Sequence, residues 1–229
     1  HFSTDDDLGG IIFAEIKVPV PLCDGANTSE QAAISEAALV RAVIEDIRRA
    51  RMEDQVILNS GSPSILRQAL AQAPEIKRAL SLNILQLLTP EEVHFITGLP
   101  VVEIPKNDCG LKWYNVGPIA RLPAMPGGDF MQRFGSFLGV AIGCDQARAV
   151  SLDKLILQQA GAAAGNLVAA VHGNGLEAIV WTIENQNEWD FVAHAGVDGI
   201  WERQERAAQQ SRRQRAGVSC PGPPHASPP

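Results

Sequence analysis

Residues 175–201, GLEAIVWTIENQNEWDFVAHAGVDGIW, decide how this chain is expected to fold. Residues 177–183 form a short, nearly continuous apolar run rich in β-branched side chains, which is typical of a parallel strand covered on both faces. The apolar residues that follow at helical spacing are Trp189, Val192 and Ala193. Gly196 then stands where helices commonly end. The stretch therefore predicts a strand, a helix and a second strand, which is one step of an α/β fold.

A second informative stretch lies near the N-terminus, where residues 11–18 read IIFAEIKV. This is an apolar strand that carries Glu15 and Lys17 near its carboxyl end. Because strand side chains alternate, Glu15 and Lys17 share a face. In a parallel barrel the inward positions at the carboxyl ends of the strands are available to a substrate. The alternative interpretation is an edge strand with two solvated charges.

These two stretches resemble motifs of one family, the glycerophosphodiester phosphodiesterases. Residues 180–183 (VWTI) followed by residues 196–200 (GVDGI) resemble its C-terminal signature, and residues 15–17 (EIK) resemble its fourth-strand motif. The matches occur in the same order as in the family. The resemblance implies a TIM barrel in which residues 177–183 form the last strand.

The resemblance implies roles for Glu15 and Lys17, and the position of Trp181 near the end of a strand suggests a third. In the family the glutamate of the strand motif is a divalent-metal ligand, so Glu15 would ligate Mg²⁺ or Ca²⁺. The lysine lies beside the substrate phosphate, so Lys17 would help to neutralise a phosphodiester. Hard cations take carboxylate oxygens, and cations promote phosphoryl transfer where charge develops. Trp181 would face the barrel mouth and stack on an alcohol or glycerol, with core packing as the alternative.

The remaining pattern extends the α/β reading. The predicted strands are residues 11–18, 55–60, 81–88, 147–152 and 177–183, and the predicted helices include residues 34–48, 64–72 and 165–173. Ser62 and Pro63 supply an N-cap and a first-turn proline. Five strands match the fourth to eighth of the family, whereas a closed barrel needs eight. In the family the fifth strand usually ends in Ser-Phe, and Gly61 replaces that phenylalanine here.

The predicted fold class is therefore α/β, a partial TIM barrel comprising family strands four to eight. Residues 1–205 would form this C-terminal portion of the barrel, with residues 89–146 as a long irregular insertion rich in Pro and Gly. Residues 206–229 are too poor in apolar side chains to fold and are predicted to be a disordered tail. The basic residues of the insertion are solvated or contact an anionic substrate; they are Lys106, Lys112, Arg121 and Arg133.

Composition limits the classes of partner. The net charge is −7 and 45% of the residues are hydrophobic, which argues against nucleic acid or an anionic membrane as the main partner. No run approaches the ~20 apolar residues of a transmembrane segment.

The cysteines show neither metal-ligand nor disulfide-framework spacing; they are Cys23, Cys109, Cys144 and Cys220. The sequence opens at His1 without a methionine, so we expect further sequence upstream, and a cytoplasmic location is only slightly favoured.

The catalytic groups that the resemblance implies are not found in this chain. The family's His-Arg-Gly start, its Glu-x-Asp metal pair and its second His-Asp motif belong to the first three strands. His172 and His194 are expected on helices, as surface or satisfied polar groups. We therefore expect a fragment that is catalytically silent, with its histidines upstream. The whole protein would be a phosphoric diester hydrolase that releases sn-glycerol 3-phosphate and an alcohol from a small-molecule glycerophosphodiester.

Two other hypotheses stay open at this stage. One is a degenerate, non-catalytic barrel that binds a phosphorylated ligand or partner. The other is a different phosphate-handling TIM barrel, in which residues 196–199 form a phosphate loop near the last strands. The last hypothesis would be favoured if Glu15 and Lys17 pointed out of the barrel.

Overall fold

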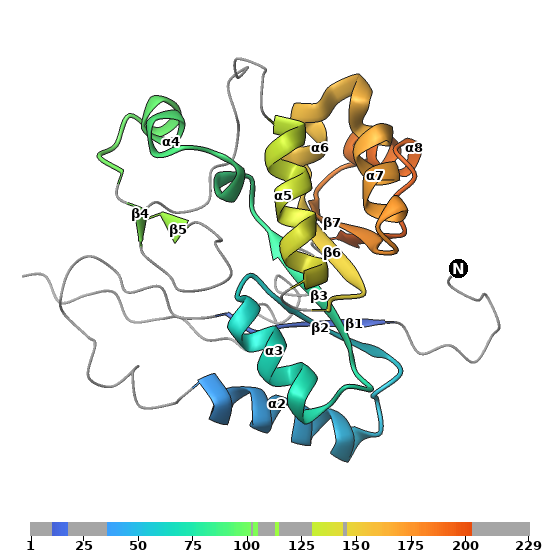
Figure 1. The fold of residues 1–229 in the computed structure, drawn as a ribbon. Helices are drawn as coiled ribbons and strands as arrows, with labels where there is room; N and C mark the ends of the chain where they lie inside the picture. The colour runs from blue at the N-terminus through green and yellow to red at the C-terminus, as the bar shows by residue number, and fades with distance from the viewer. Residues whose placement is uncertain are drawn as a thin grey trace, which may run out of the picture.

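The computed structural model describes residues 11–17, 36–101, 103–104, 113–114, 130–143 and 146–202. Its main feature is a sheet of six parallel strands in the order β1-β2-β3-β6-β7-β8. The strands are β1 (Ile12–Glu15), β2 (Val56–Ser60), β3 (Lys77–Leu82), β6 (Ala149–Asp153), β7 (Glu177–Ile183) and β8 (Gly199–Glu202). The sheet curls into a half-barrel with helices on its outer side (Figure 1). The predicted partial α/β barrel is confirmed at this level.

The strand count differs from the prediction by one. Strand β8 pairs with β7, with Ile179 opposite Gly199 and Val180 opposite Ile200. Residues 177–183 are therefore the second-to-last strand and not the last. β8 is the second strand predicted for residues 175–201, but the count of five barrel strands left it out because its apolar run is only four residues long, starts with a glycine and ends in an acid.

The limits of the third strand also differ from the prediction. Strand β3 runs over Lys77–Leu82, while residues 84–87 form the 3-10 helix η1 (Ile84–Leu87). Asn83 starts this turn, because its side chain accepts from Leu85 N at 2.9 Å while Gln86 bonds back to Asn83 N. The two basic residues that open β3 concealed its beginning, and the apolar residues of η1 resembled a strand.

Helices on the outer side bury the outward-facing side chains of the strands. Their bounds are α2 (Glu36–Ala50), α3 (Pro63–Gln72), α6 (Lys154–Ala160), η2 (Gly161–Ala163), α7 (Ala164–Gly173) and α8 (Gln186–His194). Helices α2 and α3 cover β1 and β2 in one core cluster, whose members include Ile16, Val40, Ile44, Leu58 and Ile65. The helices predicted at residues 34–48, 64–72 and 165–173 are confirmed. Ser62 is the N-cap residue of α3, although its side chain makes no capping bond.

Alternate residues of the strands line the inner face. They form a smaller cluster of Ile57, Ala79, Ala149 and Ile179, against which Phe13 packs. The register supports this assignment, since Phe13 lies opposite Ile57 and Ala79 lies opposite Ala149. Every second residue of a strand therefore points into the half-barrel.

The segment predicted as an irregular insertion contains regular helices. They are α4 (Pro90–Thr97) and α5 (Phe130–Gly143), and a two-stranded antiparallel sheet of β4 (Glu103–Ile104) and β5 (Trp113–Tyr114) lies between them in sequence. Helix α4 starts with a capping box between Thr89 and Glu92, and Gly98 ends it with φ of 66°. Helix α5 buries Phe134 and Phe137, but its interspersed glycines obscured the apolar period. The prediction of irregular structure is wrong for both helices.

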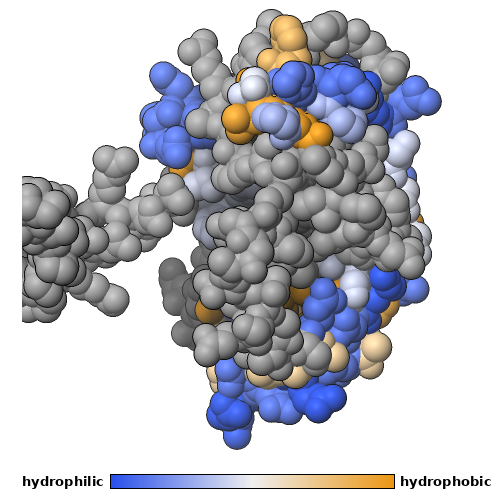
Figure 2. All heavy atoms as spheres, turned by 90° about the vertical axis from the view of Figure 1, so that its left-hand side faces the viewer, coloured by the Kyte–Doolittle hydropathy of each residue, from blue (hydrophilic) through white to orange (hydrophobic). Residues whose placement is uncertain are grey.

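Several sequence predictions lie outside the described residues. They concern the disordered tail, His1, the four cysteines and the basic residues Lys106, Lys112 and Arg121. Among the helices that are described, none combines the length and apolar character that a membrane span requires. On the face shown in Figure 2, the described residues are mostly hydrophilic, with smaller hydrophobic patches between them.

The two edge strands of the half-barrel meet through one aromatic contact. The rings of Phe13 on β1 and Trp201 on β8 stack with centroids 6.4 Å apart and an interplanar angle of 16°. The main sheet itself stays open, because among the described strands β1 pairs only with β2 and β8 only with β7. Ile11 and Ile12 at the β1 edge are 37% and 46% exposed. The edge of the sheet at β1 therefore carries exposed apolar side chains.

Candidate functional site

Glu15 and Lys17 lie together on the inner face, at the carboxyl end of β1. Ile16 between them is only 5% exposed and packs into the outer core beneath α2 and α3. Because neighbouring side chains alternate, Glu15 and Lys17 point the opposite way. Lys17 Nζ lies 3.3 Å from Glu15 Oε2, and the two side chains are 78% and 27% exposed. The pair thus presents one solvated ammonium group and one partly covered carboxylate at the mouth of the half-barrel.

Trp181 shares the inner face, near the carboxyl end of β7. Val180 before it is fully buried in the outer core, whereas Ile179 belongs to the inner cluster. Trp181 lies opposite Asp153 in the register. Its indole Nε1 is buried and has no hydrogen-bond partner among the described residues. Strands β2, β3 and β6 separate β7 from β1, so Trp181 and the Glu15–Lys17 pair stand on facing walls of the curled sheet.

Two buried polar residues on the inner face were not predicted as site residues. Asn59 lies opposite Glu15 and is 1% exposed, and Ser151 on β6 is fully buried. Both amide atoms of Asn59 and the hydroxyl of Ser151 lack partners within the described part of the chain. Buried polar groups are normally paired, so unpaired ones at strand ends mark a candidate site. The available signal was a polar residue at the end of an apolar run, as in VILNS and AVSLD.

Asp153 stands at the carboxyl end of β6, where it caps helix α6. Its Oδ1 accepts from Leu155 N at 3.0 Å. Burial raises the pKa of this carboxyl from 3.8 to about 6, against the opposing effects of backbone hydrogen bonds from Leu155 and Ile84 and of the nearby Lys154 charge. The side chain is thus a buried acid that titrates close to neutral pH, beside Trp181 in the register.

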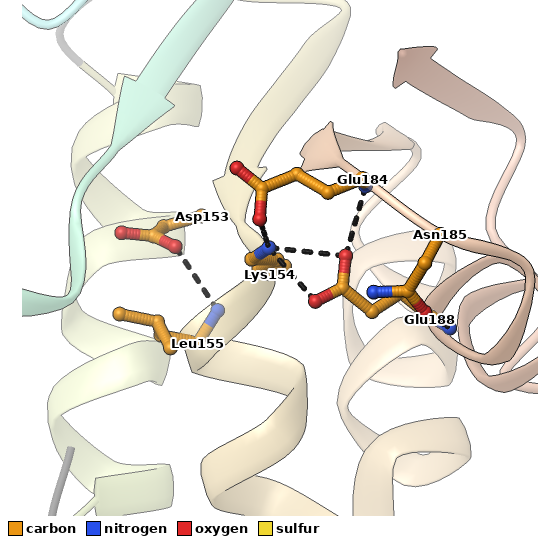
Figure 3. Close-up of polar contacts among 6 residues, drawn as sticks. All are labelled: Asp153, Lys154, Leu155, Glu184, Asn185 and Glu188. Atoms are coloured by element: carbon orange, nitrogen blue, oxygen red, sulfur yellow. Dashed lines mark hydrogen bonds and ion pairs between the residues drawn. The ribbon is translucent and has the colours of Figure 1, made fainter. Parts of the chain in front are cut away.

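Lys154 belongs to an ionic cluster and is already neutralised. Figure 3 shows its ammonium group between Glu184 and Glu188, at 3.2 Å from Glu184 Oε2 and 2.8 Å from Glu188 Oε1. Burial alone would lower the pKa of Lys154, but its hydrogen bonds to Glu188 and Glu184 outweigh burial and raise it. Burial alone would raise the pKa of Glu188, but the hydrogen bond from Lys154 and the other favourable contacts outweigh burial and lower it. The cluster joins the carboxyl ends of β6 and β7 to α8.

The sequence predicted that His172 and His194 lie on helices, and the structure confirms this. Each described histidine lies in a helix and has a partner: His94 Nδ1 with Leu99 O, His172 Nε2 with Asp198 Oδ2, and His194 Nδ1 with Asp190 O. Asp198 also accepts from Ala178 N at 2.7 Å. This contact ties the turn before β8 to the beginning of β7.

The turn proposed as an alternative phosphate loop is at the wrong end of the sheet. Residues 196–198 directly precede β8 and Gly199 begins it, so the turn lies at the amino end of this strand, opposite the edge that carries Glu15. Gly196 there has φ of 84°, which suits the end of α8. The hypothesis of a different phosphate-handling barrel would have been favoured by an outward direction of Glu15 and Lys17. Both side chains point inward instead.

Arg133, expected to be either solvated or in contact with an anionic substrate, binds other residues of the chain. Its Nη1 donates to Leu87 O at 3.0 Å and to Glu92 Oε2 at 2.6 Å. Burial raises the pKa of Glu92 in part, but the Arg133 hydrogen bond and the Thr89 backbone lower it overall. Arg133 therefore fastens α5 to η1 and α4.

The described residues alone do not form a divalent-cation site. Among them, no group of three or more His, Cys, Asp or Glu side chains is placed to hold a metal ion. Glu15 offers one carboxylate, and the Lys17 ammonium group lies beside it at 3.3 Å. A hard cation in a protein usually takes six or more oxygen ligands, several of them from carboxylates and carbonyls. Glu15 can be only one ligand of such a site.

Comparison with known proteins gives structural likeness without a sequence match. No family model and no curated protein matches the chain. A glycerophosphodiester phosphodiesterase from Parabacteroides distasonis is similar with a TM-score of 0.46 and 12% identity over 90% of this chain and 58% of that one. One from Agrobacterium tumefaciens has a TM-score of 0.41, 14% identity, and coverage of 84% and 52%.

A phosphodiesterase from Oleispira antarctica, solved with the product sn-glycerol-3-phosphate, has a TM-score of 0.41 and 13% identity, with coverage of 73% and 46%. Across seven of the similar structures this chain spans between 40% and 59% of the other chain. Identities and scores at this level carry no conclusion about activity. The resemblance to glycerophosphodiester phosphodiesterases is nevertheless found in the structure as well as in the sequence, and it covers about half the length of those chains.

Proposed function

We propose that this chain is part of a glycerophosphodiester phosphodiesterase barrel and that its inner mouth binds the substrate. Lys17 would neutralise the phosphodiester, and Trp181 would stack on the glycerol or the alcohol. The observation that supports this most is the inward-facing Glu15–Lys17 pair, 3.3 Å apart at the carboxyl end of β1. β1 is an edge strand and Lys17 is 78% exposed, so what supports the proposal is the inward direction of the pair, which follows from the burial of Ile16 in the outer core.

Hydrolysis is proposed for the whole protein. Its products would be sn-glycerol 3-phosphate and an alcohol, formed when water displaces the alcohol from phosphorus. Glu15 would be one ligand of Mg²⁺ or Ca²⁺, which would supply a Lewis acid for the phosphoryl oxygens. The other ligands and the histidines that act as acid and base would come from residues other than those described. We expect this chain to bind the product but not to hydrolyse the substrate.

Calorimetric titration with sn-glycerol 3-phosphate tests the binding part of the proposal. Lys17→Met is expected to weaken binding by about 10-fold, which corresponds to about 1.4 kcal/mol for one charge-assisted contact. Lys77→Met is the matched control, since Lys77 lies at the amino end of β3 and pairs with Glu177 at 3.9 Å. Equal binding by the wild type and Lys17→Met would contradict the proposal.

Hydrolysis of glycerophosphocholine with added Mg²⁺ tests the catalytic part. This chain is expected to show no turnover above the uncatalysed rate, and a longer form with native sequence before His1 is expected to release sn-glycerol 3-phosphate. Turnover by the present chain would show that its own residues supply the acid and base.

A second candidate function is a non-catalytic barrel that binds a phosphorylated ligand. It is favoured by one observation, that the described histidines all lie in helices with partners of their own. Binding without turnover in the longer form as well would select this candidate.

A further inference from the structure

The carboxyl end of β1 is held by two consecutive residues of β2. Ile16 N donates to Asn59 O at 2.8 Å, which extends the ladder one residue beyond Glu15. The Ile16 carbonyl oxygen then accepts from the hydroxyl of Ser60 at 2.8 Å, and this bond is buried. Both polar groups of the Ile16 backbone are therefore fixed, the second by a side chain.

Ser60 is a rigid donor for this purpose. It is 1% exposed, and its Oγ also accepts from Ser62 N at 3.1 Å, in the turn that leads into α3. The hydroxyl thus donates on one side and accepts on the other, so its orientation is determined. Because it neighbours Asn59 on the strand, its side chain points away from the inner face. Ser60 therefore does not face a ligand at the mouth.

The restraint on Ile16 controls the direction of its neighbours. The Ile16 side chain is buried in the outer core, and its amide and carbonyl groups are bonded to β2. These three restraints fix the backbone between Glu15 and Lys17. Without the Ser60 bond the carbonyl would be left buried and unpaired, which costs about 1–3 kcal/mol and favours a local rearrangement.

We propose that Ser60 is a positioning residue for the Glu15–Lys17 pair, acting through the carbonyl group of Ile16. Its hydroxyl takes the place of a further ladder bond at the point where β1 ends. For ligand binding the inference rests on the proposed function, whereas the backbone restraint can be measured without a ligand.

The first measurement is the backbone order of the segment by NMR relaxation. In the wild type the amides of Ile16 and Lys17 are expected to have order parameters near 0.85, the value of rigid backbone. In Ser60→Ala they are expected to fall below about 0.6, with the other strands unchanged. Ser60→Thr keeps the hydroxyl and is expected to restore order. Ser136→Ala is the matched control, because it removes a hydroxyl that donates to Gln132 O on the distant α5.

Unchanged order at Ile16 and Lys17 in Ser60→Ala would overturn the inference, whatever the ligand does. Should Ser60→Ala fail to fold, Ser60→Cys keeps the volume with a weaker donor and is expected to give an intermediate loss of order at the same two amides. Equal order in Ser60→Cys and the wild type would then overturn it.

The second measurement is the affinity for sn-glycerol 3-phosphate. Ser60→Ala is expected to weaken it by about 3- to 10-fold, with recovery in Ser60→Thr and no change in Ser136→Ala. If Lys17→Met and the wild type bind equally, the proposed function fails while the order parameters still decide the role of Ser60. If Lys17→Met loses binding and Ser60→Ala does not, the positioning role fails alone.

Discussion

At the scale of single residues, Asp153 has the clearest consequence for stability. Its pKa is raised from 3.8 to about 6 by burial, so the folded state holds the proton more tightly than the unfolded chain does. Between about pH 4 and pH 6 this residue therefore lowers stability as the pH rises. Above about pH 6 the full penalty of the buried charge is present.

Asp153→Asn is expected to remove this penalty, because the amide keeps an oxygen for Leu155 N and carries no charge. At pH 7.5 the variant should gain on the order of 1–3 kcal/mol of unfolding free energy, from about 1.4 kcal/mol per pKa unit. At pH 4 it should be nearly equal to the wild type. Urea unfolding at both pH values measures this difference. A larger gain at pH 4 than at pH 7.5 would contradict the assigned ionisation.

Single residues also show what a sequence can and cannot reveal about a site. Glu15 and Lys17 could be placed on one face because alternation along a strand is a local rule. For Asn59 and Ser151 the sequence offers only a polar residue near the end of an apolar run, and their missing partners could not be foreseen because pairing depends on side chains distant in the sequence. The functions of Glu15, Lys17 and Trp181 stay predictions.

At the scale of elements, the Lys154 cluster couples two βα steps. Lys154 at the start of α6 contacts Glu184 after β7 and Glu188 in the first turn of α8. Glu188 also accepts from Glu184 N at 2.9 Å. The lowered pKa of Glu188 gives stability that is lost as the pH falls through its folded value, and the raised pKa of Lys154 gives stability that is lost at alkaline pH.

Lys154→Met is expected to lower the unfolding free energy by about 1–2 kcal/mol at pH 7, since it leaves the largely covered carboxylate of Glu188 without its cation, while the more exposed Glu184 contributes little. The loss should shrink at acidic pH as Glu188, whose pKa is lowered, becomes protonated. Thermal unfolding over this pH range measures the loss of stability. Arg49→Met is the control, because it removes the cation of an exposed ion pair, Arg49–Asp46, and should change the stability little. A loss that is the same at pH 3 and pH 7 would exclude the ionic origin.

Elements with a strong apolar period were predicted correctly, and weak ones were missed. Helix α2 and strands β2 and β7 have clear patterns and appear where expected. Strand β8 was predicted after the last helix but was too short to be counted as a barrel strand, and the apolar period of α5 was obscured by its glycines. Helix α4 could have been found from Thr89-Pro90 and Glu92, which is the sequence of a capping box.

At the scale of the whole molecule, the open edge at β1 is the surface at which we expect association between chains. β1 leaves one side unpaired among the described strands, and its Ile12 is 46% exposed. Exposed apolar edge strands favour pairing with other chains, and charged side chains oppose it. Self-association is therefore expected to start at this edge.

Ile12→Lys is expected to reduce the concentration-dependent mass of the chain in sedimentation experiments, with little change in stability. Phe95→Lys on α4 is the matched control, because Phe95 is 75% exposed but lies in a helix. Phe95→Lys should leave the mass distribution unchanged. A reduction by Phe95→Lys and none by Ile12→Lys would place the association surface on α4 instead.

The stacking of Phe13 on Trp201 has a consequence for how the chain reaches its native state. The two rings are 188 positions apart (201 minus 13), so their contact closes one of the longest loops that this chain allows. Contacts of such high sequence separation raise the contact order and slow folding. The indole of Trp201 should acquire its native emission only in the last kinetic phase, after the strands between the two edges have assembled.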